Sequence, residues 1–307
     1  MLNAKIWKKR LRDSWEIYIF LIIPLLYLLL FSYIPMAGVQ IAFKRFNPNL
    51  GIWGSPWVGF RNFTRFFQSF QFGRILPNTI RLSFYGIVAG FPIPIIFALL
   101  LNVMKNGKTK KVVQTVTYMP HFISIVVLIG MLNRLLSPIN GFYAHVIRWF
   151  DLRTVDLLAQ PGLFPHLYVW SGVWQSFGWS SIIYLAALSG VSSELHEAAE
   201  IDGANRFQRV IHIDFPAILP TATILLILSC GSIISVGFEK VWLMQNDLNL
   251  RTSEVISTYV YKIGLGSGGL SDFSFATAIG LFNSVVNLIL IASVNSLTRK
   301  LSDTSLW

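Results

Sequence analysis

The chain has 307 residues, of which 54% are hydrophobic and only 13% charged, and its mean hydropathy is +0.58. Soluble domains carry about 25% charged residues, so this composition excludes an ordinary soluble globular protein. The net charge of +11 would suit a nucleic-acid-binding protein. The basic residues, however, gather at the ends of apolar stretches, so we expect no nucleic-acid partner.

Apolar stretches of about 20 residues, long enough to cross a lipid bilayer as helices, separate the clusters of charge. The backbone must be helical in lipid, because its polar groups find partners only within the segment. The sequence therefore predicts an all-α, polytopic membrane helix bundle in which residues 1–307 form a single transmembrane domain. The six predicted spans are about Trp15–Ile34, Thr79–Met104, Val113–Leu136, Leu163–Ser189, Ile218–Val241 and Phe273–Leu297.

The basic residues indicate how the chain is oriented. Residues 1–14 are basic, but the apolar stretch after them is too long for a signal peptide, so we predict an uncleaved first span. Short segments that flank spans on the cytoplasmic side are enriched in Lys and Arg. Thirteen such residues place both termini and residues 190–217 in the cytoplasm, namely Lys5, Lys8, Lys9, Arg10, Arg12, Lys105, Lys108, Lys110, Lys111, Arg206, Arg209, Arg299 and Lys300.

The first external segment, residues 36–78, interleaves aromatic residues with Arg61, Arg65 and Arg74. This pattern occurs in nucleic-acid-binding surfaces, but a helix lying in the membrane interface is the better account, because aromatic and basic side chains gather there. Cys230, the single cysteine, falls within the fifth predicted span and excludes an intrachain disulfide.

A polar island, residues 194–216, separates two apolar stretches and is where a soluble partner would dock. The pattern predicts a helix, a turn and a second helix. Ser193 is the expected N-cap of the first helix, and Asp202-Gly203 the turn. Asn205 is expected to start the second helix and Pro216 to end it.

Six positions in this island carry a resemblance to a known family. Glu197-Ala198-Ala199, then Gly203, Ile213 and Pro216 match the EAA-loop signature, which runs Glu-Ala-Ala, three residues, Gly, nine residues, Ile, one residue, Leu-Pro. The chain thus resembles the permease subunits of bacterial binding-protein-dependent ABC importers. Phe215 departs from the usual Leu but is also large and apolar. The stretch 57–63, Trp-Val-Gly-Phe-Arg-Asn-Phe, is similar to one in sugar-importer permeases, which extends the resemblance over nearly the whole chain.

The resemblance implies a cytoplasmic coupling helix that docks in a cleft of an ATPase subunit. It implies that Glu197 is a polar anchor, that Ala198 and Ala199 permit close packing, and that Gly203 forms the turn. The predicted ATPase-coupling residues are Glu197, Ala198, Ala199, Asp202, Gly203, Ile213 and Pro216.

Two other motifs are incomplete. Gly107-Lys108-Thr109 would need a glycine at position 102 to be a phosphate-binding loop, but that residue is Asn102. His196-Glu197-Ala198-Ala199-Glu200 lacks the second histidine of a zinc-protease motif. We therefore expect no catalytic residue, no metal and no cofactor in this chain, with ATP and Mg bound by partner subunits.

The substrate path is predicted from the spans before and after the EAA loop, which in related sugar permeases contribute to the sugar site. Aromatic faces stack on sugars, and amide, hydroxyl and carboxylate groups bond their hydroxyls. The same residues would also serve as interfacial anchors or in helix packing, and this alternative stays open. The candidates are Trp170, Trp174, Gln175, Trp179, Ser229, Ser232, Ser235 and Glu239.

The function implied is that of a non-catalytic permease subunit of an ATP-driven carbohydrate importer, moving an oligosaccharide inward by alternating access across the bacterial inner membrane. The implied partners are two ATPase subunits, a second homologous permease, an external solute-binding protein, the carbohydrate and the lipid bilayer. Two alternatives remain: an importer of the same type for an osmolyte, phosphate or peptide, and a self-sufficient secondary transporter or membrane enzyme. The latter would need paired ionisable groups in mid-membrane, and few are present.

Overall fold

The computed structural model describes residues 14–104, 107–231, 233–266 and 271–301, and these residues are almost wholly helical. Among them the one β pairing is an isolated bridge between Lys44 and Trp57. The predicted basic N-terminus and Ser232 lie outside the described residues. The elements are α2 (Trp15–Leu28), η1 (Leu29–Tyr33), η2 (Ile34–Phe43), α3 (Gly51–Gly54), α4 (Arg61–Gln68), α5 (Phe72–Gly90), α6 (Pro92–Val103), α7 (Gly107–Tyr118), η3 (Met119–Phe122), α8 (Ile125–Leu135), α9 (Phe142–Trp149), α10 (Phe164–Ser189), α11 (Ser193–Ile201), α12 (Arg206–Arg209), η4 (Val210–Asp214), α13 (Phe215–Gly231), α14 (Phe238–Met244), α15 (Leu250–Ser253), α16 (Ile256–Leu265) and α17 (Phe273–Leu301).

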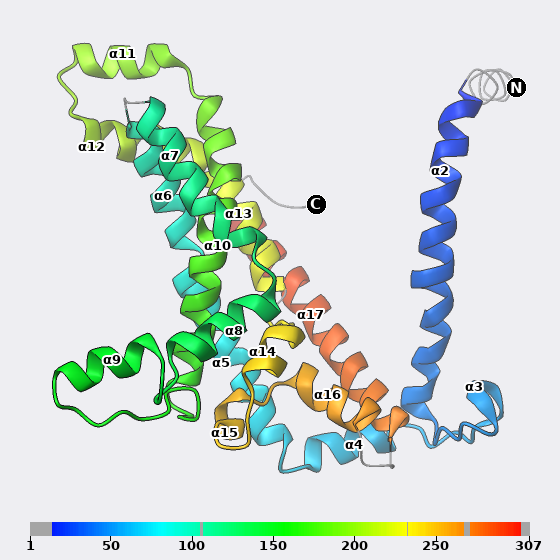
Figure 1. The fold of residues 1–307 in the computed structure, drawn as a ribbon. Helices are drawn as coiled ribbons and strands as arrows, with labels where there is room; N and C mark the ends of the chain where they lie inside the picture. The colour runs from blue at the N-terminus through cyan, green and yellow to red at the C-terminus, as the bar shows by residue number, and fades with distance from the viewer. Residues whose placement is uncertain (1–13, 105–106, 232, 267–270, 302–307) are drawn as a thin grey trace, which may run out of the picture.

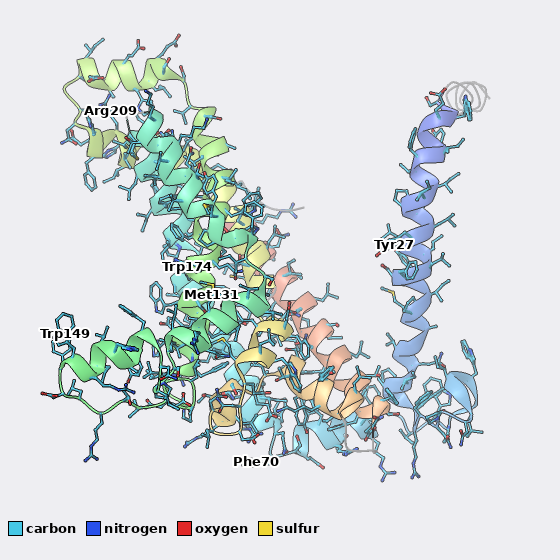
Figure 2. All side chains as sticks on the ribbon, viewed as in Figure 1. Tyr27, Phe70, Met131, Trp149, Trp174 and Arg209 are labelled. Carbon is cyan, nitrogen blue, oxygen red and sulfur yellow. The ribbon has the colours of Figure 1, made fainter. Side chains whose placement is uncertain are left out.

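Helix α10 lies at the centre of the bundle and packs against α5, α6, α7 and α13. Helices α11 and α12 lie across one end, while α4, α14, α15 and α16 gather at the opposite end (Figure 1). Helix α2 stands apart from the bundle and starts at the end where α11 lies, and η2, which continues it, packs against α17. The described side chains of α2 are exposed and lie away from the bundle, and Tyr27 contacts the ring of Phe31 in η1, which continues the helix (Figure 2).

Four helices among the described residues are long and apolar enough to cross a membrane, and they confirm the all-α membrane bundle. They correspond to the first, second, fifth and sixth predicted spans, but their bounds differ. The first continues beyond Ile34, and the second begins seven residues before Thr79. The four are Tyr18–Phe43, Phe72–Val103, Arg206–Gly231 and Phe273–Arg299.

The third predicted span is wrong as a continuous helix. Gly107–Phe122 and Ile125–Leu135 meet at an angle of 98°. Pro120, which lacks an N–H for the helical ladder, lies near the end of the first arm, and the break itself falls at Ile123 and Ser124. Ser124 then caps a new helix, its hydroxyl accepting a hydrogen bond from the Val127 N–H at 3.3 Å.

The fourth predicted span is the single helix α10, whose 26 residues would extend about 39 Å. Its length suffices to cross a bilayer, but it is not one of the four helices named above as both long and apolar enough. Its buried face carries Ser171, Gly178 and Ser181, small residues that allow neighbouring helices to approach. The count of six crossings therefore stays a prediction.

The fifth predicted span is displaced toward the N-terminus. It begins at Arg206 and ends at Gly231, because the helix runs unbroken from the EAA loop through Pro216. A π turn, η4, directly precedes this proline and contains the bond from the Phe215 N–H to the Val210 carbonyl. The expectation that Pro216 ends the second loop helix is thus wrong, since the wider turn accommodates the missing donor.

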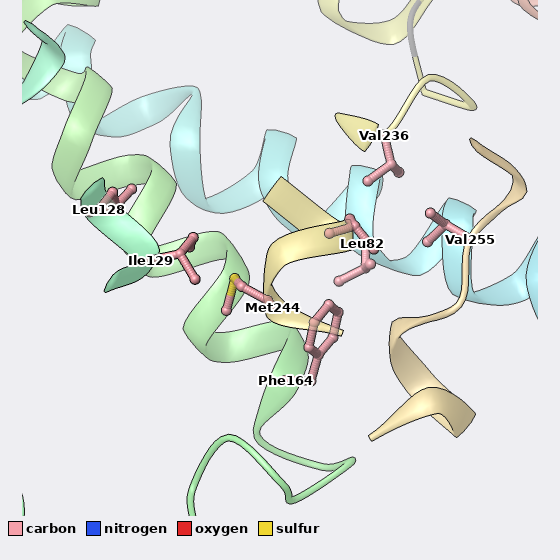
Figure 3. Packing of buried hydrophobic residues seen from close by; sticks show 8 residues of the cluster. Leu82, Leu128, Ile129, Phe164, Val236, Met244 and Val255 are labelled. Carbon is pink, nitrogen blue, oxygen red and sulfur yellow. The ribbon is translucent and has the colours of Figure 1, made fainter. Parts of the chain in front are cut away.

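A cluster of eight buried hydrophobic residues lies where α14 and the segment before α16 pack into the bundle. Val236, Val241, Met244 and Val255 pack there against Leu82 of α5 (Figure 3). Beside this cluster, aromatic residues of the predicted interfacial segment turn inward. Phe66 of α4 is fully buried against Phe72, Phe275 and Phe282, so it serves the core and not the membrane interface.

The bundle depends on close approach of α10 to α7 at Gly178. A Cβ atom there would lie 2.3 Å from the carbonyl oxygen of Thr117. Because backbone must shift to relieve this overlap, we expect Gly178→Ala to lower the free energy of unfolding by about 1–3 kcal/mol. Thermal unfolding of the purified variant and wild-type proteins in detergent measures this loss of stability. Gly130→Ala is the control, because a Cβ there meets nothing within 4 Å, and equal effects of the two changes would contradict the packing.

Candidate functional site

Helix α11 is closed at both ends by its own sequence. Ser192, and not Ser193 as predicted, is its N-cap, accepting a hydrogen bond from the Glu194 N–H at 3.2 Å. At the other end Gly203 adopts a φ of 80°. The Gly203 N–H donates to the Glu200 carbonyl at 3.1 Å and the Ala204 N–H to the Ala199 carbonyl at 2.8 Å. This is a Schellman motif, and it confirms the predicted turn at Asp202-Gly203.

The second loop helix starts at Asn205, as the sequence predicts. The Asn205 side chain accepts from the Gln208 N–H at 2.9 Å, and the Gln208 side chain accepts from the Asn205 N–H at 2.8 Å. This capping box satisfies two N-terminal donors reciprocally. Arg209 then pairs with Glu200 of α11 at 2.9 Å, which joins the two helices across the turn.

Four of the seven predicted coupling residues line one small hollow of about 290 Å³ between these helices. They are Ala199, Asp202, Gly203 and Ile213. Glu197 and Ala198 are exposed on α11, and Pro216 lies outside the hollow. Their docking role stays a prediction.

Large apolar side chains project from this otherwise polar loop. Ile201 is 86% exposed, Phe207 is 71% exposed and Leu195 is 56% exposed. An apolar group of this kind at one end of a bundle is typical of a protein–protein contact surface. It adds residues that the sequence motif alone did not identify.

A second candidate site is a cavity of about 720 Å³ between α5, α6, α10 and α13. Its volume lies within the range of small-molecule binding pockets. Three predicted substrate-path residues line it, namely Trp179, Ser229 and Ser235. The Trp179 ring stacks on His121, with centroids 4.7 Å apart, and Ser235 accepts a hydrogen bond from Asn287 at 2.7 Å.

The remaining described candidates do not line this cavity. Trp170 and Trp174 line a separate apolar pocket with Met131 of α8, and Figure 2 shows Trp174 beside Met131. Gln175 donates to the Ile123 carbonyl at 2.7 Å, which fixes the bend between η3 and α8. Glu239 is exposed on α14. The structure thus places these four residues outside the cavity that Trp179 lines, and their role in the substrate path stays a prediction.

Sequence reasoning missed the contribution of α5 and most of the hydroxyl groups. The additional polar or small lining residues are Ser83, Gly86, Gly90, Tyr168, Ser176, Ser180, Tyr184 and Gly237. The spacing of Ser83, Gly86 and Gly90, at intervals of three and four, was a signal that these residues share one helix face.

The fold and both sites define an inner-membrane component of a transport system. The family model described as binding-protein-dependent transport system inner membrane component matches residues 90–303, and the chain belongs to this family.

Individual relatives match over almost their full length. Protein LplB of Bacillus subtilis (strain 168) is 41% identical, covering 96% of this chain and 92% of the relative. The polygalacturonan/rhamnogalacturonan transport system permease protein YteP of the same organism is 40% identical, and the match covers 100% of this chain and 97% of the relative. A solved chain of a bacterial ABC transporter involved in import of the acidic polysaccharide alginate superposes with a TM-score of 0.88 at 38% identity. The match covers 97% of this chain and 99% of the solved chain. The predicted resemblance to ABC importer permeases is thus confirmed.

Gly203 allows a test of the coupling loop by conformation alone, because a Cβ there meets nothing within 4 Å. Valine at a φ of 80° is strained, by about 1–3 kcal/mol, whereas asparagine tolerates this region. We expect Gly203→Val to lower transport per ATP hydrolysed while membrane insertion is unchanged, and Gly203→Asn to behave as wild type. Uptake and hydrolysis measured on the same proteoliposomes test this. Full coupling in the valine variant would refute the role of the turn.

Proposed function

We propose that this chain is the permease subunit of an ATP-driven, binding-protein-dependent importer that moves an oligosaccharide inward by alternating access. The observation that carries the proposal is the pairing of an exposed, doubly capped helix α11 at one end of the bundle with a cavity lined by Trp179 and several hydroxyl groups. An aromatic face beside hydroxyl groups suits a sugar ring. Two similar proteins are described as handling polygalacturonan/rhamnogalacturonan and alginate, which supports an oligosaccharide over an osmolyte, phosphate or peptide.

The chain supplies no hydrolytic site in this proposal. Two ATPase subunits bind ATP and Mg in the cytoplasm, and their closure moves the coupling helices. Residues Glu197, Ala198 and Ala199 form the docking face of α11, and Leu195 and Ile201 extend it with apolar surface. Both termini lie in the cytoplasm, which agrees with the start of α2 at the same end as α11.

A second permease covers helix α2. Residues 15–16 and 18–36 are exposed, although they are mostly apolar. Lipid would cover part of this surface, and packing against a homologous subunit accounts for why α2 stands apart from its own bundle. An external binding protein delivers the sugar; a structure of the similar alginate transporter is described in complex with an alginate pentasaccharide-bound periplasmic protein.

Reconstitution tests the proposal. The complex of both permeases and the ATPase subunits is placed in proteoliposomes, and the binding protein is supplied with a panel of neutral and uronate-containing oligosaccharides. We expect at least one oligosaccharide to stimulate ATP hydrolysis and to enter in an ATP-dependent manner. Uptake without ATP would favour a secondary transporter, and stimulation by a non-sugar solute alone would favour the other importer class.

Trp179 provides a residue-level prediction in the same assay. An aromatic contact is worth about 1 kcal/mol, so Trp179→Ala should lower the uptake rate roughly fivefold while Trp179→Phe retains most of it. Trp174→Ala is the matched control: this residue is on the same helix, is 45% exposed against 42% for Trp179, and lines a different pocket. Equal losses from Trp174→Ala and Trp179→Ala would argue against the cavity as the sugar path.

A further inference from the structure

Helix α11 is only loosely attached to the bundle. None of its residues is buried. Within the described chain, two polar side-chain contacts join it to other elements: the Glu200–Arg209 pair and the approach of His196 to Asp214. Glu200 is 65% exposed in the first contact, whereas the Asp214 side chain is only 3% exposed in the second. The two contacts therefore differ greatly in how easily water replaces them.

Asp214 joins three elements through one oxygen atom. Its Oδ1 accepts a hydrogen bond from Nδ2 of Asn102, near the end of α6, at 3.2 Å. The Nε2 atom of His196, on α11, lies 3.3 Å from the same oxygen. Asp214 is itself the last residue of η4 and leads directly into α13. A single carboxylate thus connects the coupling helix with the ends of two long helices that face the cavity.

Burial makes this connection hard to break. A buried carboxylate that loses its donors remains desolvated and unpaired, which is strongly unfavourable. In the Glu200–Arg209 pair the Glu200 side chain is 65% exposed and Arg209 16%, so water reaches the carboxylate and replaces this contact at a lower cost than it replaces one to Asp214. If α11 moved away alone, the buried Asp214 carboxylate would keep Asn102 but lose its contact to His196, so a displacement of α11 that preserves this contact draws α6 and α13 with it. Pro94 of α6 and Ser229 of α13 line the cavity, so this motion reaches its wall.

We propose that Asp214 is a positioning residue that transmits displacement of α11 to α6 and α13, and that it acts through His196 and Asn102. The proposal rests on the function proposed above and adds to the EAA motif a position that this motif leaves unspecified. The π turn that holds Asp214 belongs to a class of helix irregularity often found at functional sites.

The test compares coupling ratios, meaning sugar taken up per ATP hydrolysed, in the reconstituted complex. We expect Asp214→Ala and His196→Ala each to lower this ratio at least fivefold while ATP hydrolysis and the amount of assembled complex stay near wild type. Because both changes remove the His196–Asp214 contact, and Asp214→Ala also removes the one to Asn102, the double variant should be no worse than the more affected single variant. His196→Gln, which keeps an N–H donor, should restore part of the ratio. Glu200→Gln is the control, since it breaks the exposed contact of the same helix.

Three results would overturn the proposal: a wild-type ratio in both alanine variants, additive losses in the double variant, or losses that only parallel the amount of complex. If Asp214→Ala fails to assemble, the His196 series decides, because that side chain is 28% exposed and tolerates substitution more readily.

A distance measurement that needs no sugar tests the role of Asp214 independently of the proposed transport of an oligosaccharide. Spin labels are placed at Glu194 and Leu100, both exposed, in a Cys230→Ser background. Their distance distribution should stay narrow when ATP is added to the wild-type complex and should broaden in Asp214→Ala. Unchanged distributions in the variant would contradict the role of Asp214, even if no oligosaccharide in the panel is transported.

Discussion

The structure depends on the requirement that backbone polar groups be satisfied where no water is available. Long helices satisfy these groups through their own backbone hydrogen bonds, and at each break in a helix neighbouring side-chain or backbone groups do so instead. Between Phe122 and Ile125 the chain turns by 98°, and Ser124 caps the helix that follows. Before Pro216 a π turn keeps the helix continuous. These two solutions give different mechanics, because the capped break divides the chain into two arms whose angle is held by contacts such as the Gln175–Ile123 hydrogen bond, whereas a continuous helix carries motion along its length.

The coupling loop contains one helix that ends at a break and one that continues into a long helix. Its first helix is a separate body, stopped by the left-handed Gly203, and its second helix is continuous with α13. A force applied to α11 therefore reaches the cavity by two routes, one along the chain and one through the buried carboxylate of Asp214. Since α10 packs against α5, α6 and α13, a movement of these helices changes the shape of the cavity that they enclose.

The sequence predicted the parts of this account that are local. Fixed spacing identified the EAA loop, and residue types located the turn and the cap at Asn205. What it could not predict arises from contacts across the chain: Asn102 and Asp214 are 112 positions apart, and neither was singled out. Trp170 and Trp179 illustrate a different limit of residue type as a guide. They are nine positions apart, so helical geometry of about 100° per residue places them on opposite faces, and only Trp179 lines the larger cavity.

The central claim is that α11 is a cytoplasmic lever contacted by a separate ATPase. The most direct measurement places a single cysteine at Ala198, in a Cys230→Ser background, and labels it with a membrane-impermeant maleimide. The account predicts no labelling in intact cells, labelling in inside-out vesicles stripped of the ATPase subunits, and protection when these subunits are added back. Labelling of intact cells would contradict it.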